Sequence, residues 1–378
     1  ILLPVWYPDH LPESREKMTD QQQSPISNYY TKQVPIHVLA EGIGKYLCRT
    51  TFNNLRLTCK DVYQITEKMV RPWPHKSLVV GKASIQSIAF SPDGSKLCCR
   101  DRSGKIHVWD RSIGKEKTWG GKSLVRSACL GNIVCSPDNR FLAFDGKSKS
   151  IQVCSIQDGA AGKSLKSLHG HHGAITSLAF HADGRTLASG STDSTIRLWD
   201  LGTGKCQRTM RKHRGFVYSV TFSPDGQRLA SGGSDRMIRI WNPFGAATAT
   251  AAASHHHHHQ DDILVLRGHS LVVVSLSFSP INSNLLASGS LDGTLRLWDV
   301  LNQSCLQCVQ HGSEILTVCF APSGIRLAAG KSDETIILWN VQEEKEEAEF
   351  NGRLLSFAPD GVTLATAGRD GIVKLQSI

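Results

Sequence analysis

The sequence has no apolar run that approaches the roughly 20 residues needed to span a bilayer as a helix. Pro4 and Asp9 interrupt its first segment, so we expect neither a membrane anchor nor a signal peptide. The 11 cysteines lack the spacing of a disulfide framework or a zinc site, because Cys305 and Cys308 form a CxxC without a second pair. This pattern favours reduced thiols and a cytoplasmic or nuclear location.

The composition is otherwise that of an ordinary soluble protein. The chain has 378 residues, of which 40% are hydrophobic and 20% charged, and its formal net charge is +10. This length suits two or three domains or a single repeat architecture. The positive charge is compatible with acidic partners, although a mildly basic protein without such partners would have the same composition.

A four-residue turn recurs along the chain, each time between short apolar strands. It is Ser-Pro-Asp-Gly at residues 91–94 and 223–226, and related turns occupy 136–139, 181–184, 321–324 and 358–361. A longer variant begins at Ser279-Pro280. Proline presets φ at the first turn position, and Gly or Asn tolerates the left-handed position that closes a hairpin. The seven turns therefore predict seven antiparallel units.

A tryptophan closes most of these units. Such residues end alternating strands, and Cys154 and Gln376 hold the equivalent places in two weaker units; the tryptophans are Trp109, Trp199, Trp241, Trp298 and Trp339. A unit of roughly 40–45 residues, with four short strands and a closing Trp-Asp at 199–200 and 298–299, resembles a WD repeat. The resemblance covers about residues 76–378 and implies an all-β, closed, seven-bladed β-propeller. The last unit has only three strands, so residues 77–80 are predicted to supply its fourth.

Three units carry His, Ser, Asp and Trp at matching offsets. The sets are His171, Ser189, Asp193 and Trp199; His213, Ser231, Asp235 and Trp241; and His269, Ser288, Asp292 and Trp298. A Ser-His-Asp set can indicate a hydrolase, but an active site needs one nucleophile and an oxyanion hole, not three copies around a ring. The resemblance implies a structural hydrogen-bond network inside each blade. We therefore expect no enzyme, no catalytic residue and no cofactor.

Basic residues gather in the loops that WD-repeat propellers place on one face. We predict that this face binds an acidic or phosphorylated peptide, since guanidinium groups suit carboxylates and phosphates. A solvated charged rim is the alternative. We do not expect nucleic-acid binding, because no aromatic stacking series interleaves the basic residues. The predicted face consists of Lys82, Arg100, Arg102, Lys122, Lys147, Arg214, Arg236, Arg267, Lys331 and Arg369.

One unit contains a long insertion, residues 244–262, between its third and fourth strands. It holds Ala-Thr repeats and five consecutive histidines, 255–259. We predict a disordered loop without a metal, because nothing in the sequence fixes the geometry of the histidines.

The amino-terminal region precedes the repeats. Residues 1–33 are polar and predicted to be disordered, whereas residues 34–74 have the apolar spacing of short helices. The latter segment resembles an F-box in its Pro35 opening, its leucine-rich second part, Cys59-Lys60 and its closing Trp73, although Val34 replaces the usual leucine. The resemblance implies that a Skp-type adaptor would be bound by Pro35, Leu39, Ile43 and Leu47. A small helical cap on the propeller is the alternative.

The sequence thus predicts three parts: a leader of 1–33, an F-box-like segment of 34–74 and a propeller of 75–378. If both resemblances hold, the chain is a substrate receptor of a Skp/cullin/F-box-type ubiquitin ligase, acting by tethering. The alternative is a WD-repeat scaffold subunit of a nuclear or cytoplasmic assembly with no link to ubiquitin. Fold alone does not decide between them.

Overall fold

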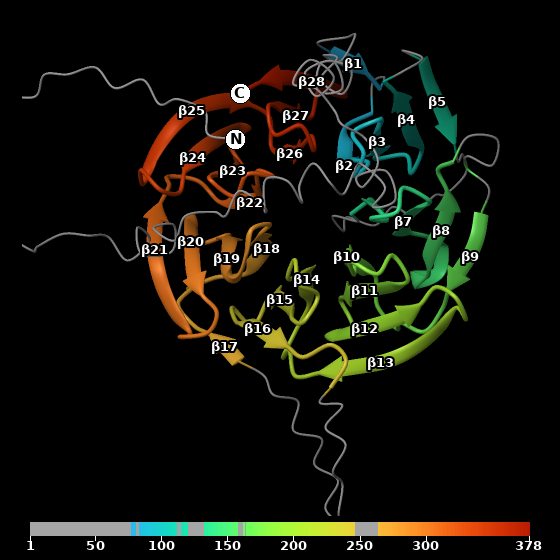
Figure 1. Ribbon diagram of the computed structural model, residues 1–378, viewed down its shortest axis with the longest axis horizontal. Coiled ribbons are helices and arrows are strands. Elements are labelled where there is room, and N and C mark those ends of the chain that lie inside the picture. The colour runs from blue at the N-terminus through green and yellow to red at the C-terminus, as the bar shows by residue number, and fades with distance from the viewer. Residues whose placement is uncertain are drawn as a thin grey trace, which may run out of the picture.

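The computed structural model describes residues 77–80, 83–111, 115–119, 132–157, 162, 164–245 and 264–378. These residues form seven four-stranded antiparallel sheets arranged as blades around a central axis (Figure 1), along which a channel lies. The predicted seven-bladed β-propeller is confirmed. The predicted F-box-like segment, its domain boundaries and the histidine run lie outside the described residues.

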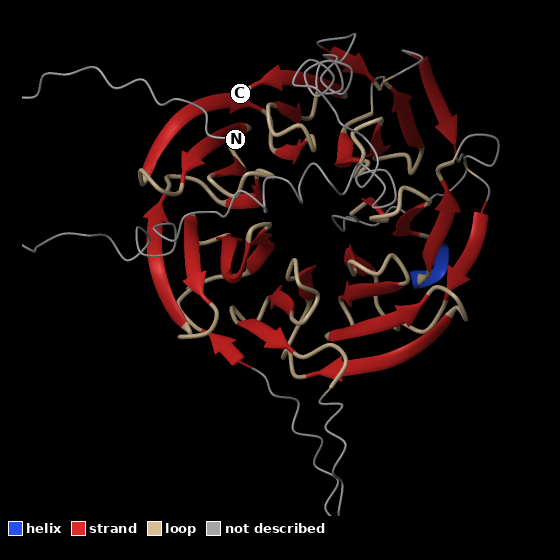
Figure 2. Ribbon diagram, in the orientation of Figure 1, coloured by secondary structure: helices blue, strands red, loops and turns tan. Residues whose placement is uncertain are grey.

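Six blades are built in chain order from the innermost strand outward, whereas the outermost strand of the seventh comes from the start of the described residues (Figure 1). Strands joined by loops make up every blade (Figure 2). The first two blades are β2 (Ile85–Phe90), β3 (Lys96–Asp101), β4 (Ile106–Asp110) and β5 (Lys115–Trp119), then β6 (Val134–Cys135), β7 (Phe141–Asp145), β8 (Ile151–Ser155) and β9 (Ser164–Leu168). A short 3-10 turn, Lys147–Lys149, joins β7 to β8. The third blade is β10 (Ile175–Phe180), β11 (Thr186–Ser191), β12 (Thr195–Asp200) and β13 (Lys205–Arg211).

The remaining blades repeat this pattern. The fourth and fifth are β14 (Val217–Phe222), β15 (Leu229–Gly233), β16 (Ile238–Trp241) and β17 (Leu264–Leu266), then β18 (Val273–Ser279), β19 (Asn282–Ser290), β20 (Thr294–Asp299) and β21 (Ser304–Gln310). The sixth is β22 (Ile315–Phe320), β23 (Arg326–Lys331), β24 (Thr335–Asn340) and β25 (Lys345–Asn351). The seventh is β26 (Leu354–Phe357), β27 (Thr363–Ala367), β28 (Ile372–Ser377) and β1 (Ser77–Val79).

The ring is fastened by its two ends, as predicted. Strand β1 pairs antiparallel with β28, in the register Leu78 opposite Val373. The Val80 N–H extends the pairing by donating to the Gly371 carbonyl (2.9 Å). Leu78 is 5% exposed and packs in one apolar cluster with Ile85 of the first blade. Closure therefore completes the seventh blade and buries Leu78, while Ser77 and Val79 remain exposed.

The recurring turns form a ring at one end of the propeller. In an antiparallel blade the first-to-second and third-to-fourth turns share one end, which we call the lower face. Their contacts are polar between the first two blades, where the Asp93 N–H donates to Asn139 Oδ1 (3.2 Å). Between the fifth and sixth blades they are apolar, since Ile281 lies against Gly324. The turns thus contact one another, which helps to fix the order of the blades.

Hydrogen bonds between innermost strands also join the blades. The bulges in β2, β10, β14 and β18 are each followed by a serine: Ser87, Ser177, Ser219 and Ser275. Each hydroxyl accepts a backbone N–H from the next blade, at 2.9, 3.1, 3.0 and 3.0 Å. These serines were missed in the sequence, because only the assembled ring brings the donors to them.

In the part of the chain that the structure describes, no helix is long and apolar enough to cross a membrane.

Candidate functional site

The end of the propeller opposite the lower face carries the candidate site. We call it the upper face; it consists of the connections that lead into each blade and the turns between second and third strands. Those turns include residues 102–105, 192–194, 234–237, 291–293, 332–334 and 368–371. Most of the residues predicted to bind a peptide or to form the networks lie in these loops or in the strands beside them.

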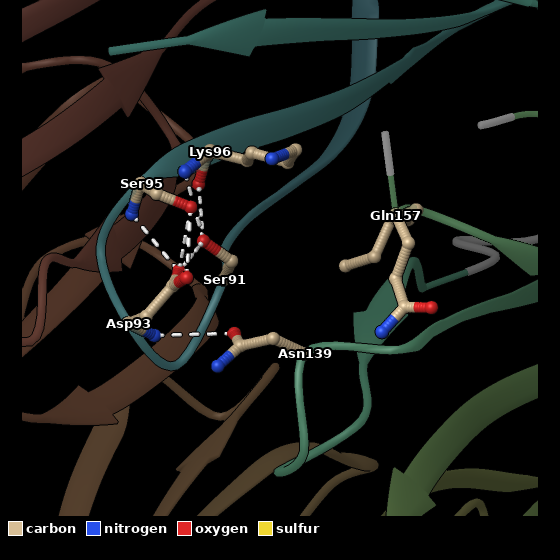
Figure 3. A pocket seen from close by; sticks show the side chains of 7 residues that line it. Ser91, Asp93, Ser95, Lys96, Asn139 and Gln157 are labelled. Carbon is tan, nitrogen blue, oxygen red and sulfur yellow. Dashed lines mark hydrogen bonds between the residues drawn. The ribbon is translucent and has the colours of Figure 1, made fainter. Parts of the chain in front are cut away.

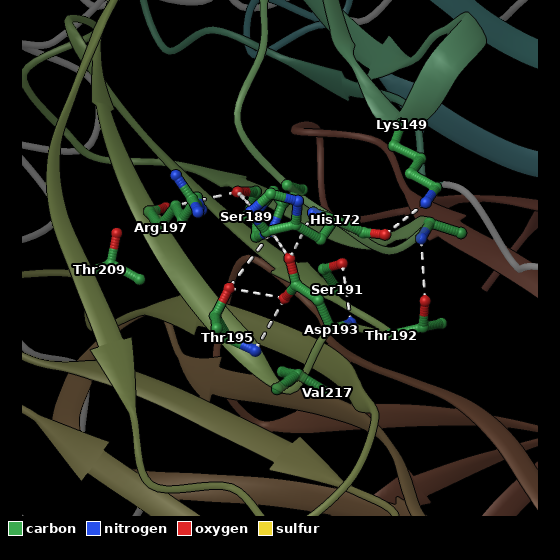
Figure 4. Close-up of polar contacts among 12 residues, drawn as sticks. Lys149, His172, Ser189, Ser191, Thr192, Asp193, Thr195, Arg197, Thr209 and Val217 are labelled. Carbon is green, nitrogen blue, oxygen red and sulfur yellow. Dashed lines mark hydrogen bonds and ion pairs between the residues drawn. The ribbon is translucent and has the colours of Figure 1, made fainter.

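A relay of hydrogen bonds holds the upper face of the third blade together. The Trp199 indole N–H donates to Ser189 Oγ (2.8 Å), which lies 2.7 Å from His171 Nε2. His171 Nδ1 lies 2.8 Å from Asp193 Oδ2. A carboxylate only accepts, so Nδ1 carries the proton and Nε2 accepts from the serine hydroxyl. Figure 4 shows Ser189, Asp193 and Thr195 turned toward one another inside the blade.

The fourth and fifth blades repeat the relay. Trp–Ser distances are 2.8 and 2.7 Å, Ser–His distances are both 2.7 Å, and His–Asp distances are both 3.0 Å. These bonds join His213, Ser231, Asp235 and Trp241 in one blade and His269, Ser288, Asp292 and Trp298 in the other. The serines and imidazoles are buried, so the groups that resemble a catalytic triad are committed to one another.

The carboxylates of these relays remain ionised. Burial opposes the ionisation of Asp235, but the hydrogen bond from His213 and the His213 charge outweigh it and lower the Asp235 pKa to about 2. Asp193 and Asp292 have their pKa lowered in the same way against the effect of burial, with help from the hydroxyls of Thr195 and Thr294. The carboxylates of these three upper-face residues therefore accept hydrogen bonds within their own blades.

The sixth blade lacks the serine that joins tryptophan to histidine in the complete relays. Ala329 stands opposite Val318 and Ile337, just as Ser189 stands opposite Leu178 and Arg197. Trp339 Nε1 and His311 Nε2 are buried and have no hydrogen-bond partner. The carboxylate of this blade, Asp333, accepts from the Ser313 hydroxyl instead (2.6 Å). Alanine therefore leaves two polar atoms unsatisfied.

Two other blades use substitutes, of which the sequence revealed the one in the seventh blade but not the one in the first. In the seventh, Gln376 Nε2 donates to Thr366 Oγ1 (3.2 Å) where tryptophan and serine stand elsewhere. In the first, His107 comes from β4 and lies 3.2 Å from Asp101 through Nε2, while stacking on Trp109. These contacts support blades that lack the full motif.

Nine of the ten predicted basic residues separate into three groups. Lys82 and Lys122 lie outside the described residues, as does the side chain of Lys147. Lys331 is half-buried, with Asp333 and Glu349 at 3.6 and 3.8 Å. Exposed side chains on the upper face belong to Arg102, Arg214, Arg236, Arg267 and Arg369.

The prediction that Arg100 belongs to the peptide-binding face is wrong. Its side chain is only 3% exposed and forms an ion pair with Asp145 of the second blade. Burial lowers the pKa of this guanidinium, and Asp101 opposes that effect. Arg100 therefore joins two blades and is not available to a peptide. The local sequence gave no sign of this, because Asp145 belongs to another unit.

Exposed apolar side chains accompany the arginines. Phe216 is 46% exposed and Leu271 is 50% exposed, each in a connection that leads into a blade. The Phe216 ring makes an edge contact with Tyr218 at 6.2 Å. Arg236 joins its own turn to the connection that carries Leu271, because its guanidinium donates to the Ser270 carbonyl at 3.5 Å. The upper face thus offers aromatic, aliphatic and basic groups together.

The central channel opens beside these loops. Its volume is about 430 Å³, and innermost strands from all seven blades line it. Tyr218 lines its wall, and Arg353 is the only charged residue among the described residues that do so. Arg353 was not among the residues predicted from the sequence, because no motif marks its position.

A second hollow, of about 390 Å³, lies at the lower face between the first two blades. Its polar groups bond to one another: the Ser91 and Ser95 hydroxyls donate to Asp93 at 2.6 and 2.8 Å (Figure 3). Lys96, on the same wall, lies 3.3 Å from Asp110. These bonds stabilise the turn and occupy the polar groups that could otherwise bind a ligand. No group of three His, Cys, Asp or Glu among the described residues could hold a metal.

Comparison with known proteins identifies repeats of one family. Its model, "WD domain, G-beta repeat", matches residues 74–110, 162–200, 204–242, 260–299, 303–340 and 354–376. The second blade is the one without a match, in keeping with its lack of the relay residues.

Several curated proteins are similar over large parts of the chain. Periodic tryptophan protein 2 of Arabidopsis thaliana is 29% identical over 70% of this chain and 28% of its own length. THO complex subunit 3 of the same plant is 32% identical over 48% of this chain and 42% of its own. Its Pre-mRNA-processing factor 19 homolog 2 is 29% identical over 57% and 32%. The chain thus spans between about a quarter and half of these relatives.

A solved structure has the same fold. A chain of the crystal structure of a mitotic checkpoint complex superposes with a TM-score of 0.67, covering 82% of this chain and 92% of that one. The sequence identity is 18%, so this likeness concerns the fold alone.

Proposed function

The chain belongs to the family of WD-repeat propellers, and on this premise we propose that it is a non-catalytic scaffold subunit of a multiprotein assembly. Its upper face would bind a partner segment that carries acidic or phosphorylated residues and an apolar anchor. Members of the family are generally scaffolds. This reading corresponds to the alternative that the sequence left open, and it needs no ubiquitin ligase.

One observation carries the proposal: the upper face exposes basic and apolar side chains while three of its acids are bonded internally. Arg214 and Arg236 are exposed beside Phe216 and Leu271, whereas the neighbouring Asp235 accepts from His213. A face with this composition repels cations and attracts a segment of opposite charge. Burying the exposed aromatic and aliphatic side chains under a partner would remove apolar surface from water and so stabilise the complex.

The names of the relatives support an assembly. One is called a subunit of the THO complex and another a pre-mRNA-processing factor. Because pre-mRNA is processed in the nucleus, these names favour the nuclear part of the predicted cytoplasmic or nuclear location.

The ubiquitin-ligase reading stays a prediction from resemblance. Its predicted adaptor-binding residues, Pro35, Leu39, Ile43 and Leu47, lie outside the described residues. A pull-down of the full chain with a purified Skp-type adaptor tests it, with Leu39→Asp/Ile43→Asp as the control. Binding that the double substitution abolishes would restore the ligase receptor as the leading function.

The proposed function is tested by affinity purification of the tagged full chain from native cells, followed by quantitative mass spectrometry. Phe216→Asp and Leu271→Asp should each remove the partners that co-purify with the unaltered chain. Ile325→Asp is the matched control, because Ile325 is also exposed (37%) but lies on the lower face. Partners that survive both upper-face changes and disappear with Ile325→Asp would contradict the proposed binding face.

A further inference from the structure

Two cysteines lie on the outer edge of the fifth blade, where neither the relays nor the upper face uses them. Cys305 and Cys308 both belong to β21, the outermost strand of that blade (Figure 1), and both are exposed. In the sequence they form a CxxC without the second pair that a zinc site needs. Whether two such thiols can react with each other depends on which faces of the strand they occupy.

A β-bulge places both thiols on the same face of β21. Side chains of a regular strand alternate, so residues three apart point in opposite directions. Here Cys308 stands opposite Arg296 and Cys305 opposite Trp298, and the register shift between them leaves Leu306 as the extra residue. Arg296 and Trp298 share one face of β20, where the guanidinium carbon lies 5.8 Å from the centre of the indole ring. The two cysteines share that face as well, and their Cα separation is close to that of residues two apart, about 6.6 Å.

The third blade shows how close two side chains come at these positions. Its outermost strand, β13, has the same bulge, and Cys206 stands opposite the closing Trp199 there. Thr209 stands opposite Arg197, in the place that the second cysteine has in the fifth blade. Cys206 Sγ lies 3.6 Å from Thr209 Oγ1. Because a disulfide joins Cα atoms that are about 4.4–6.8 Å apart, two thiols at these positions are within reach of one bond.

The sulfur atoms of the third and fifth blades also have the same local geometry. Cys206 Sγ lies 3.3 Å from the Arg208 carbonyl oxygen, and Cys305 Sγ lies 3.2 Å from that of Gln307. Both cysteines thus donate to the carbonyl two residues further along the chain. The contact measured in the third blade therefore applies to the cysteine pair of the fifth.

Arg296 lies beside both thiols. Its Nη1 atom is 3.7 Å from Cys305 Sγ, and the residue stands directly opposite Cys308. A guanidinium stabilises a thiolate relative to a thiol. Partial burial nevertheless raises the pKa of the Cys305 thiol; the hydrogen bond and charge of Arg296 oppose this effect, and Cys308 adds to it. Cys305 is therefore a protonated thiol at neutral pH, which leaves the first attack on an oxidant to Cys308.

We propose that Cys305 and Cys308 form a modification site, which closes reversibly to an intramolecular disulfide when a hydroperoxide reaches the outer edge of the propeller. The inference goes beyond the proposed function, because the site lies on the rim of the fifth blade and not on the upper face. Disulfides in the cytoplasm and nucleus are usually transient and sense oxidants, which agrees with the predicted location.

The reaction with hydrogen peroxide has two steps. The Cys308 thiol loses its proton and its sulfur attacks one peroxide oxygen; the O–O bond breaks, and the hydroxide that leaves takes up this proton to give water. The Cys305 sulfur then attacks the sulfenic acid on Cys308. The S–S bond forms, the S–O bond breaks, and hydroxide leaves with the Cys305 proton as a second water. The two thiols lose two electrons in total, and a dithiol reductant returns them by thiol–disulfide exchange.

Treatment of the reduced full chain with hydrogen peroxide tests the site. The remaining thiols are then blocked with N-ethylmaleimide in denaturant and the chain is digested with trypsin. Cys305, Cys308 and Cys319 fall in one peptide, 297–326. We expect tandem mass spectrometry to show this peptide lighter by two hydrogen atoms, with a single maleimide on Cys319, and dithiothreitol to restore all three thiols. Cys319 is the internal control, because burial raises its pKa to about 11.

Two variants test the geometry. Gln307→Cys/Cys308→Ser keeps two thiols but moves the second to the position opposite Leu297, on the other face of β21. It should form the disulfide at least about tenfold more slowly than the unaltered chain. Thr209→Cys places the equivalent pair in the third blade and should add a disulfide between positions 206 and 209 under the same conditions.

A third variant tests the cation. Arg296→Met removes the positive charge beside the Cys305 sulfur and should slow disulfide formation about threefold, whereas Arg296→Lys should restore most of the rate. Circular dichroism should be the same for both variants, so that a general loss of structure does not explain the difference.

Three results would overturn the site. One is a 297–326 peptide that keeps three maleimides or carries a sulfinic acid without a disulfide. The second is a disulfide from Cys305 or Cys308 to any other cysteine. The third is an equal rate in the unaltered chain and in Gln307→Cys/Cys308→Ser. If circular dichroism shows that this double variant does not fold, the unaltered chain and Thr209→Cys decide.

Discussion

The incomplete relay of the sixth blade can be repaired by one hydroxyl group. Ala329→Ser places Oγ where Trp339 Nε1 and His311 Nε2 have no partner. The β-ladder register is that of the complete blades, in which the same hydroxyl lies 2.7 to 2.8 Å from both nitrogens. Burial lowers the pKa of His311, and Lys331 adds to the effect, so its imidazole is neutral and can accept the hydroxyl proton.

The expected gain follows from two new hydrogen bonds. Each contributes about 1 kcal/mol net, and the burial of the hydroxyl subtracts part of the sum. We therefore expect the free energy of unfolding to rise by about 1–2 kcal/mol, and the melting temperature by about 2–5 °C for a domain of this size. Ala329 is fully buried, so the gain should not depend on salt concentration.

Ala328→Ser is the matched control on the same strand. Ala328 is also 0% exposed, but it packs in an apolar cluster with Leu338 and Phe357. Its hydroxyl would be buried without a partner, which costs about 1–3 kcal/mol. Urea unfolding followed by circular dichroism and tryptophan fluorescence measures both variants. If Ala329→Ser is no more stable than the unaltered chain while Ala328→Ser loses stability, the reasoning about the relay is refuted.

Three other predictions concern closure, the relays and pH. Leu78→Asp should cost about 3–5 kcal/mol by thermal unfolding, because it puts a charge into the cluster that closes the ring; an unchanged melting temperature would contradict this. Asp193→Ala should cost about 1–3 kcal/mol and Asp370→Ala less than about 0.5, because only Asp193 is bonded to a histidine; equal urea midpoints would contradict it. Urea midpoints should fall as pH drops below about 6.5, because burial lowers the pKa of His269 in the folded state, and again from about pH 4 to 2, because Asp235 has a folded pKa of about 2. Asp235→Asn should flatten the second fall, and a midpoint independent of pH would contradict the scheme.

The blade count and the order of strands could be predicted from the sequence because each is encoded locally. Pro-Asp-Gly turns fix hairpins, and a closing tryptophan such as Trp199 marks the third strand in five of the seven blades. The pairing of β1 with β28 followed from simple counting, since a blade with three strands exposes an edge. At these positions the local turn and strand preferences favour the same structure as closure of the ring.

Contacts between units could not be predicted in this way. Arg100 stands in a second-to-third-strand hairpin like other arginines, yet it pairs with Asp145 of the next blade and is buried. Arg353 carries no motif, and its backbone contacts Ala367 of its own blade and lies against Gly330 of the sixth. In the first blade the histidine that bonds the aspartate is His107 of strand β4, whereas in the complete relays it lies in the loop before the blade. Such contacts depend on how the ring closes, which the pattern within one repeat does not specify.

The central claim is that partners bind the upper face of this scaffold. Site-specific photocrosslinking in cells tests it most directly, with p-benzoyl-phenylalanine placed at Phe216, Leu271 or, on the lower face, Ile325. We predict that the first two positions crosslink the same partner proteins and that position 325 does not. Crosslinks to those partners from position 325 alone would show that the assembly uses the opposite face and would contradict the claim.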